Sequence, residues 1–93
     1  MRTYEFTVIF KPNDEEVAKG KETIANEFKE AGVQVTKEDN IGIKFLAYPI
    51  KKSEKGHYVY YELEANPETI STLDRHFKLM TPILKFLFVK KDN

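Results

Sequence analysis

The 93-residue sequence contains no cysteine, and this absence excludes several kinds of chemistry. Without cysteine the chain has no disulfide framework, no thiolate metal ligand and no thiol nucleophile. Long uninterrupted apolar segments are also missing, and residues 1–10 alternate polar and apolar side chains instead of forming the hydrophobic region of a signal peptide. We therefore expect a soluble, cytoplasmic protein that does not enter a membrane.

An excess of one charge sign is missing as well. Fifteen basic and fifteen acidic residues balance each other, so the whole chain has no general attraction to nucleic acid or to a membrane. Any contact with a polyanion must come from local clusters. Lysines gather within residues 51–55 and 85–91, and acids within 14–16 and 62–68, although a solvated surface of mixed charge also explains each cluster.

The sequence shows no signature of catalysis or of ligand binding. His57 and His76 lack the spacing to a second histidine or cysteine that a metal site needs. The four glycines form no phosphate-cradling loop, and Glu62 and Glu64 alternate along an expected strand without forming an acid/base pair. We expect no enzyme activity, no metal, no cofactor and no small-molecule substrate.

Patterns of apolar residues predict six structural elements. Residues 2–10 alternate strictly, which predicts a strand with one buried face. Apolar residues then recur at helical spacing, from the capping candidates Asn13 and Asp14 to Gly32, which suits a left-handed helix end. A second strand is expected to begin at Val33, but an unbroken run to Ile50 would far exceed the usual strand length of about 5–6 residues, so a bend is expected within it. The other expected elements are strands at 57–64 and 83–89, and a helix that begins at Asn66 and Pro67 and is stopped by Pro82.

The segment 42–50 is unusual because a strand-like run contains both a glycine and a proline. Pro49 cannot donate a backbone hydrogen bond to a sheet, which predicts that this strand lies at an edge. The polar interval 37–40 and Gly42 predict a bulge or kink before it. Residues 51–56 are expected to form a polar connection, after which the chain returns as the third strand of a hairpin.

The order strand, helix, strand, strand, helix, strand predicts one α+β domain over residues 1–93, with the ferredoxin-like fold. Its four-stranded antiparallel sheet has both helices on one face, with strands one and three inside. Alternation in the last strand predicts one face of Leu84, Phe86 and Phe88 and another of Ile83, Leu87 and Val89. On the sheet face without helices, we expect a partner-binding surface of Ile9, Phe45, Tyr58, Tyr60, Leu87 and Val89.

Several stretches resemble the bacterial small-subunit ribosomal protein six family. They are residues 1–5, the run from Gly42 to Ile50, Gly56 with the aromatic strand after it, and the closing Val89 and Lys90. The similarity covers nearly the whole chain, and the pattern Gly-x-Lys-x-Leu-Ala-Tyr-Pro-Ile is its most specific part. The resemblance implies a ferredoxin-like structural component of the small ribosomal subunit, which serves translation and is no enzyme.

The resemblance also implies binding to the central domain of small-subunit ribosomal RNA together with ribosomal protein eighteen. The residues expected to contact RNA are Arg2, Lys44, Lys85 and Lys90. The residues expected to contact the partner are Phe45, Tyr58, Tyr60, Leu87 and Val89. Phe45 and Leu84 depart from the family's pattern, because both positions are commonly polar or basic there, and both departures enlarge the apolar surface.

Two other functions stay open. Residues 55–61 partly match the RNP1 pattern of RNA-recognition motifs, in which aromatic side chains such as Tyr58 and Tyr60 stack on bases of single-stranded RNA. A small-molecule regulatory domain or an acylphosphatase-like enzyme would share the expected fold, since fold does not determine function. Residues 11–13, however, are Lys, Pro and Asn, and lack the arginine-bearing phosphate loop that acyl-phosphate hydrolysis needs.

Overall fold

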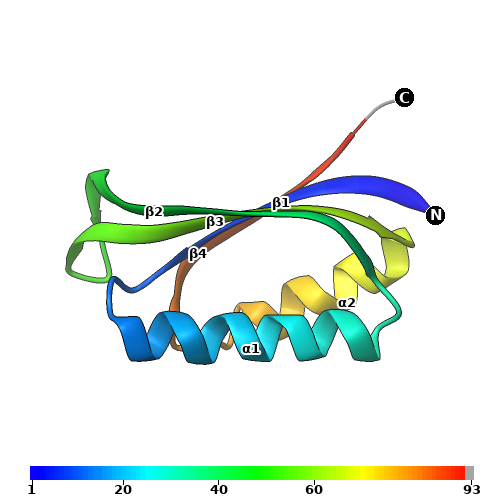
Figure 1. The fold of residues 1–93 in the computed structure, drawn as a ribbon, viewed down its shortest axis with the longest axis horizontal. Helices are drawn as coiled ribbons and strands as arrows, with labels where there is room; N and C mark the ends of the chain where they lie inside the picture. The colour runs from blue at the N-terminus through cyan, green and yellow to red at the C-terminus, as the bar shows by residue number, and fades with distance from the viewer. Residues whose placement is uncertain (92–93) are drawn as a thin grey trace.

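Four strands form one antiparallel sheet, and two helices cover one of its faces (Figure 1). The structure is a computed structural model, and it describes residues 1–91. Across the sheet the strand order is β2-β3-β1-β4, which confirms the ferredoxin-like fold with strands one and three inside. The elements in chain order are β1 (Arg2–Phe10), α1 (Asp14–Glu30), β2 (Gln34–Ile50), β3 (Ser53–Ala65), α2 (Pro67–Phe77) and β4 (Ile83–Lys90).

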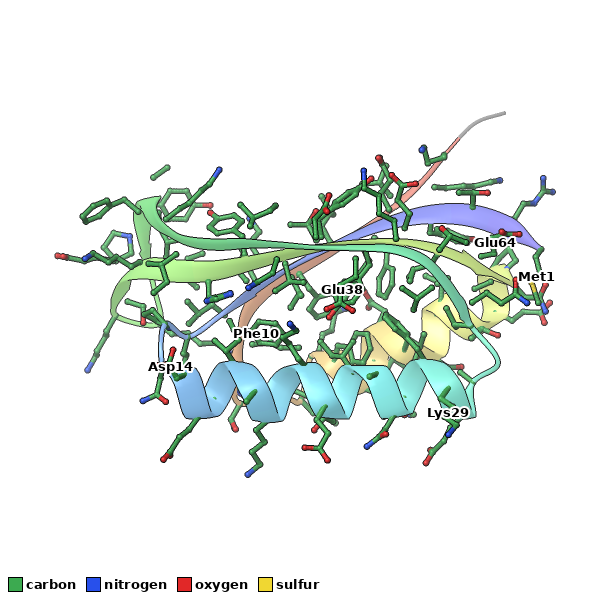
Figure 2. All side chains as sticks on the ribbon, in the orientation of Figure 1. Met1, Phe10, Asp14, Lys29, Glu38 and Glu64 are labelled. Atoms are coloured by element: carbon green, nitrogen blue, oxygen red, sulfur yellow. The ribbon has the colours of Figure 1, made fainter. Side chains whose placement is uncertain are left out.

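The hydrophobic core lies between the sheet and the helices (Figure 2). Phe6, in the middle of β1, is completely buried, and its ring stacks on Phe88 of β4 at 4.4 Å between centroids. Phe28 of α1 and Phe77 of α2 complete the cluster, at 5.7 and 5.5 Å from Phe6. Fully burying such a side chain contributes about 1.5–3 kcal/mol. This aromatic centre therefore joins both helices to the two neighbouring strands β1 and β4.

Both ends of α1 follow the predicted capping. The side chain of Asn13 accepts hydrogen bonds from the backbone N–H groups of Glu15 and Glu16, at 2.9 and 3.3 Å. At the other end Gly32 has φ +74°, a backbone conformation that favours glycine. The N–H of Val33 donates to the carbonyl of Phe28, which is the Schellman pattern. Sequence therefore determines where this helix starts and stops.

The second helix begins as predicted but ends earlier. Asn66 precedes it and Pro67 opens it, whereas its last residue is Phe77 and not the residue before Pro82. Two tight turns follow, in which Leu79 donates to His76 and Met80 donates to Phe77. Pro82 comes after the cap residue Lys78 and these two turns, so it does not stop the helix.

The connection between β2 and β3 is much shorter than predicted. Residues 51–56 were expected to be a polar connection, but Ile50 already pairs with Ser53, so only Lys51 and Lys52 form the turn. Both have positive φ, 48° and 67°, as the two central residues of a type I′ hairpin turn require. Such turns are usually recognised by an Asn-Gly pair, and here two lysines stand in its place. The sequence therefore did not predict the turn.

Strand β2 is a long edge strand with interruptions in its pairing. Its register against β3 shifts between Val35 and Lys37, between Asn40 and Gly42, and again between Phe45 and Ile50. Gly42 has φ +103°, which confirms the predicted irregularity at this position. The strand lies at the sheet edge, as predicted from the proline within it.

A bulge at the start of β4 changes which side chains reach the core. Phe10 pairs with Ile83 but Ile9 pairs with Lys85, so the register shifts at Leu84. The predicted grouping of Leu84 with Phe86 and Phe88 is therefore wrong. Ile83 belongs to the core on the helix side, and Leu84 is buried outside it.

Candidate nucleic-acid and partner interface

The uncovered face of the sheet, which we call the open face, carries most of the predicted interface residues. Along the ladder, Ile9 pairs with Tyr58 and Thr7 pairs with Tyr60. On the other side of β1, Thr7 pairs with Leu87 and Glu5 pairs with Val89. Since directly paired residues point to the same face, the structure brings four of the five predicted partner-binding residues together: Tyr58, Tyr60, Leu87 and Val89.

The end of the open face nearest the hairpin is apolar. A recess of about 120 Å³ lies there, lined by Ile9, Tyr58, Lys85 and four residues near the end of β2: Leu46, Ala47, Tyr48 and Ile50. Gly56 allows this packing, because a methyl group at that position would collide with Cγ2 of Ile9. Tyr48 is 62 % exposed at the rim. The recess therefore combines aliphatic contact area with one lysine.

The opposite end of the open face is acidic. Tyr60 donates its hydroxyl to Oε2 of Glu5 at 2.6 Å and to Oε2 of Glu62 at 3.0 Å. The hydrogen bond to Glu5, followed by desolvation and by the bond to Glu62, raises the pKa of Tyr60 above its usual value. Lys91 lies 4.0 Å from Glu62 and only partly offsets these charges. Carboxylates therefore surround the hydroxyl of Tyr60.

Along the same face, β4 leaves apolar side chains exposed. Leu87 is 58 % exposed and Val89 is 44 % exposed, although both belong to a regular strand. A shallow hollow of about 220 Å³ adjoins Leu87 and is bounded by Thr7, Ile9, Lys85 and Phe86. Isolated exposed apolar residues are common, but a row of them on one sheet face is typical of a surface that another molecule covers.

Phe45 does not lie on the open face, contrary to the prediction. It pairs with Lys55, whereas the next residue, Gly56, is the one that faces Ile9. Phe45 therefore points to the side of the sheet that carries the helices. There its ring is contacted by the ammonium group of Lys55, 4.8 Å from the ring centre.

The four predicted RNA-contacting residues fall into two separate pairs. Lys44, opposite Gly56, and Lys85, opposite Ile9, lie on the open face near the hairpin. Arg2 pairs with the buried Ala65, and Lys90 pairs with the buried Tyr4, so both project from the helix side at the far end of β1. Seven residues of strand separate Arg2 from Ile9, which is about 24 Å. These four residues cannot form one compact phosphate site.

The sequence-based list of site residues omitted the lysines of the hairpin turn. Lys51 donates to the carbonyl of Ile83 at 3.1 Å, which ties the turn to the start of β4. Lys52 and Lys55 line a hollow of about 330 Å³ together with Pro12, Ser53 and Glu54. Their clustering was visible in the sequence, but the two-residue turn formed by Lys51 and Lys52 was not.

Other kinds of site were also considered. Within residues 1–91, no group of three acidic or histidine side chains is arranged to hold a metal ion. None of the helices described is long and apolar enough to cross a membrane. A hollow of about 660 Å³ lies between α2 and β4 and has Asp74, Arg75 and Leu87 in its wall.

Comparison with known proteins gives a consistent result. The small ribosomal subunit protein bS6 of Treponema denticola is 37 % identical over 93 residues, covering all of both chains. The bS6 protein of Mycolicibacterium paratuberculosis is 39 % identical over 94 residues, covering 99 % of this chain and 98 % of that protein. The crystal structure of 30S ribosomal protein S6 from Thermotoga maritima superposes with a TM-score of 0.88 at 22 % identity, covering 97 % of this chain and 87 % of that one.

A protein with a different name shares only the fold. The C-terminal domain of the MgtC protein from Mycobacterium tuberculosis superposes with a TM-score of 0.67 but at 10 % identity. Membership of a family must therefore come from sequence and not from architecture. The family model described as Ribosomal protein S6 matches residues 3–90. The chain therefore belongs to the ribosomal protein S6 family, as a small ribosomal subunit protein of the bS6 type.

Proposed function

We propose that this protein binds the central domain of small-subunit ribosomal RNA, in the cytoplasm, as one half of a pair with ribosomal protein eighteen. The observation that carries the proposal is the open face, where Tyr58, Leu87 and Val89 leave apolar surface uncovered in a chain without net charge. Phosphate neutralisation supplies most non-specific affinity for RNA. A neutral protein with an apolar face therefore needs a partner to become a strong RNA ligand.

The open face is assigned to the protein partner and its margins to RNA. Tyr58, Leu87 and Val89 offer contact area without charge, whereas Lys44 and Lys85 stand at the border of that area near the hairpin. Arg2 and Lys90 are free to contact a different part of the RNA from the opposite end of the sheet. This division requires RNA to contact two margins of the protein while the partner occupies the face between them.

The alternative of base stacking on the open face has less support. Single-strand binders of this kind place bases on aromatic side chains in a positively charged groove. Here the hydroxyl of Tyr60 is tied to Glu5 and Glu62, and Asp39 is its cross-strand neighbour. The phosphates of a strand crossing Tyr60 would approach these carboxylates.

Binding of a central-domain RNA fragment, measured with and without ribosomal protein eighteen, tests the proposal. We expect tight binding only when both proteins are present. Leu87→Asp should weaken the protein pair, because it places a charge in the apolar contact. The matched control is Leu79→Asp, since Leu79 is 84 % exposed in the turn after α2, away from the open face. Equal RNA affinity with and without the partner would contradict the proposal.

A further inference from the structure

The hairpin tip, defined here as residues 45–55, has an exposed aromatic ring that no packing in the protein explains. Phe45 is 75 % exposed, and it lies away from the open face. The hairpin extends beyond the start of α1, so neither helix covers this part of the sheet (Figure 1). Exposing a phenylalanine to water is unfavourable, which makes the ring a candidate contact for another molecule.

The ring of Phe45 has one occupied face and one that remains available. The ammonium group of Lys55 lies over one face at 4.8 Å from the ring centre. The large exposed fraction of Phe45 leaves the other face open to solvent. A flat ring with a cation behind it suits stacking of a nucleobase, because every base has a π-face and cations strengthen such contacts.

The charges near the ring of Phe45 indicate what kind of molecule it would bind. Residues 45–55 carry three lysines and one acid, Glu54, in a chain whose total charge is zero. Lys52, Lys55 and the hydroxyl-bearing Ser53 line the hollow of about 330 Å³ beside the hairpin, together with Pro12 and the single acid Glu54. A protein partner that needs only an apolar contact gains little from this lysine excess, whereas an RNA strand supplies a phosphate for each base.

We propose that the hairpin tip holds one unpaired nucleotide of the ribosomal RNA, with its base stacked on the exposed face of Phe45 and its flanking phosphates against Lys52 and Lys55. This inference rests on the proposed RNA binding and reassigns Phe45 from the protein partner to RNA. The carboxylates of Asp14, Glu15 and Glu16 in the first turn of α1 repel phosphate because they carry the same charge, so the strand follows the hairpin and not the helix end.

The test uses the pair with ribosomal protein eighteen bound to the central-domain fragment. We expect Phe45→Ala to weaken RNA binding about 5- to 150-fold, the range measured for loss of one base stack. Phe45→Tyr keeps the ring and should bind nearly as the wild type does. Leu79→Ala removes another exposed apolar side chain, in the turn after α2 and outside residues 45–55, and should have no effect. Thermal unfolding of each variant confirms that it is folded.

Charge and contact are tested separately. Lys55→Gln should weaken RNA binding and reduce its dependence on salt, whereas Lys29→Gln, at the exposed end of α1, should do neither. A photo-crosslinking phenylalanine analogue in place of Phe45 should attach to a single RNA nucleotide. Attachment to ribosomal protein eighteen instead would overturn the inference.

Failure of this inference differs from failure of the proposed function. If the wild-type pair binds the fragment and Phe45→Ala binds equally well, the stacking contact is wrong and the partnership stands. If the wild-type pair does not bind the fragment at all, the proposed function itself is wrong.

Discussion

At the scale of single residues, Gly56 decides how closely β1 and the hairpin pack. Cγ2 of Ile9 occupies the space that a Cβ atom at position 56 would need. Cδ1 of Leu84 would lie 3.7 Å from that Cβ atom. We expect Gly56→Ala to lower the free energy of unfolding by about 1–3 kcal/mol, as overpacking does, measured by denaturant unfolding.

A double variant provides the control for this prediction. Ile9→Ala removes the methyl group that collides, so in that background Gly56→Ala should cause a much smaller loss. An equal loss in both backgrounds would show that the glycine is needed for another reason.

Two neighbouring tyrosines give the protein a pH dependence in the alkaline range. The hydrogen bond to Glu5 raises the pKa of Tyr60, and desolvation, with the charge of Glu38, raises the pKa of Tyr61. The unfolded chain loses these protons near the usual tyrosine pKa of about 10, before the folded protein does. The stabilisation is therefore complete at neutral pH and decreases as the pH rises above about 10.

Measurements of the free energy of unfolding between pH 9 and 11 give the slope of stability against pH. Tyr60→Phe should reduce the loss of stability with rising pH, because one titrating group is removed from both states. An unchanged slope in Tyr60→Phe would contradict the contribution of Tyr60 to the pH dependence of stability.

At the scale of elements, the hairpin turn combines backbone strain with a role in binding. Lys52 has φ +67°, a conformation that costs a residue with a side chain about 1–2 kcal/mol. Lys52→Gly relieves this strain but makes the unfolded chain more flexible, so we expect a net gain of roughly 0.5–1 kcal/mol in unfolding free energy. The same variant should bind RNA less tightly, as titration with the central-domain fragment would show. Stability and affinity should thus change in opposite directions.

Elements whose ends carry their own chemical signals could be predicted, and the others could not. Asn13 and Gly32 form local hydrogen bonds, so the sequence placed α1 within a residue or two. The turn at Lys51 and Lys52 depends on the pairing of two long strands and on the hydrogen bond from Lys51 to Ile83. Neither interaction can be predicted from the residues next to the turn. The bulge at Leu84 likewise arises only when β4 meets β1.

At the scale of the whole molecule, the fold followed from the order of elements and the handedness of their connections. The predicted site was less complete. Alternation along β1 and β3 correctly placed Tyr58 and Tyr60 on the open face, because those strands pair without a register shift. For Phe45 the same reasoning was wrong, since the register of β2 shifts twice before that residue. Arg2 and Lys85 lie near opposite ends of the sheet, a separation that only the assembled sheet reveals.

The separation of charge along the sheet means that the net charge of zero is a poor description of this protein. Six residues of β3 separate Glu62 from Gly56, a distance of about 20 Å, whereas charges in physiological salt are screened beyond about 8 Å. The lysine-rich hairpin and the acidic end of the open face therefore act as independent poles. On the open face, a polyanion is therefore attracted by the lysines at the hairpin and repelled by the carboxylates around Tyr60, which favours one orientation of the protein on it.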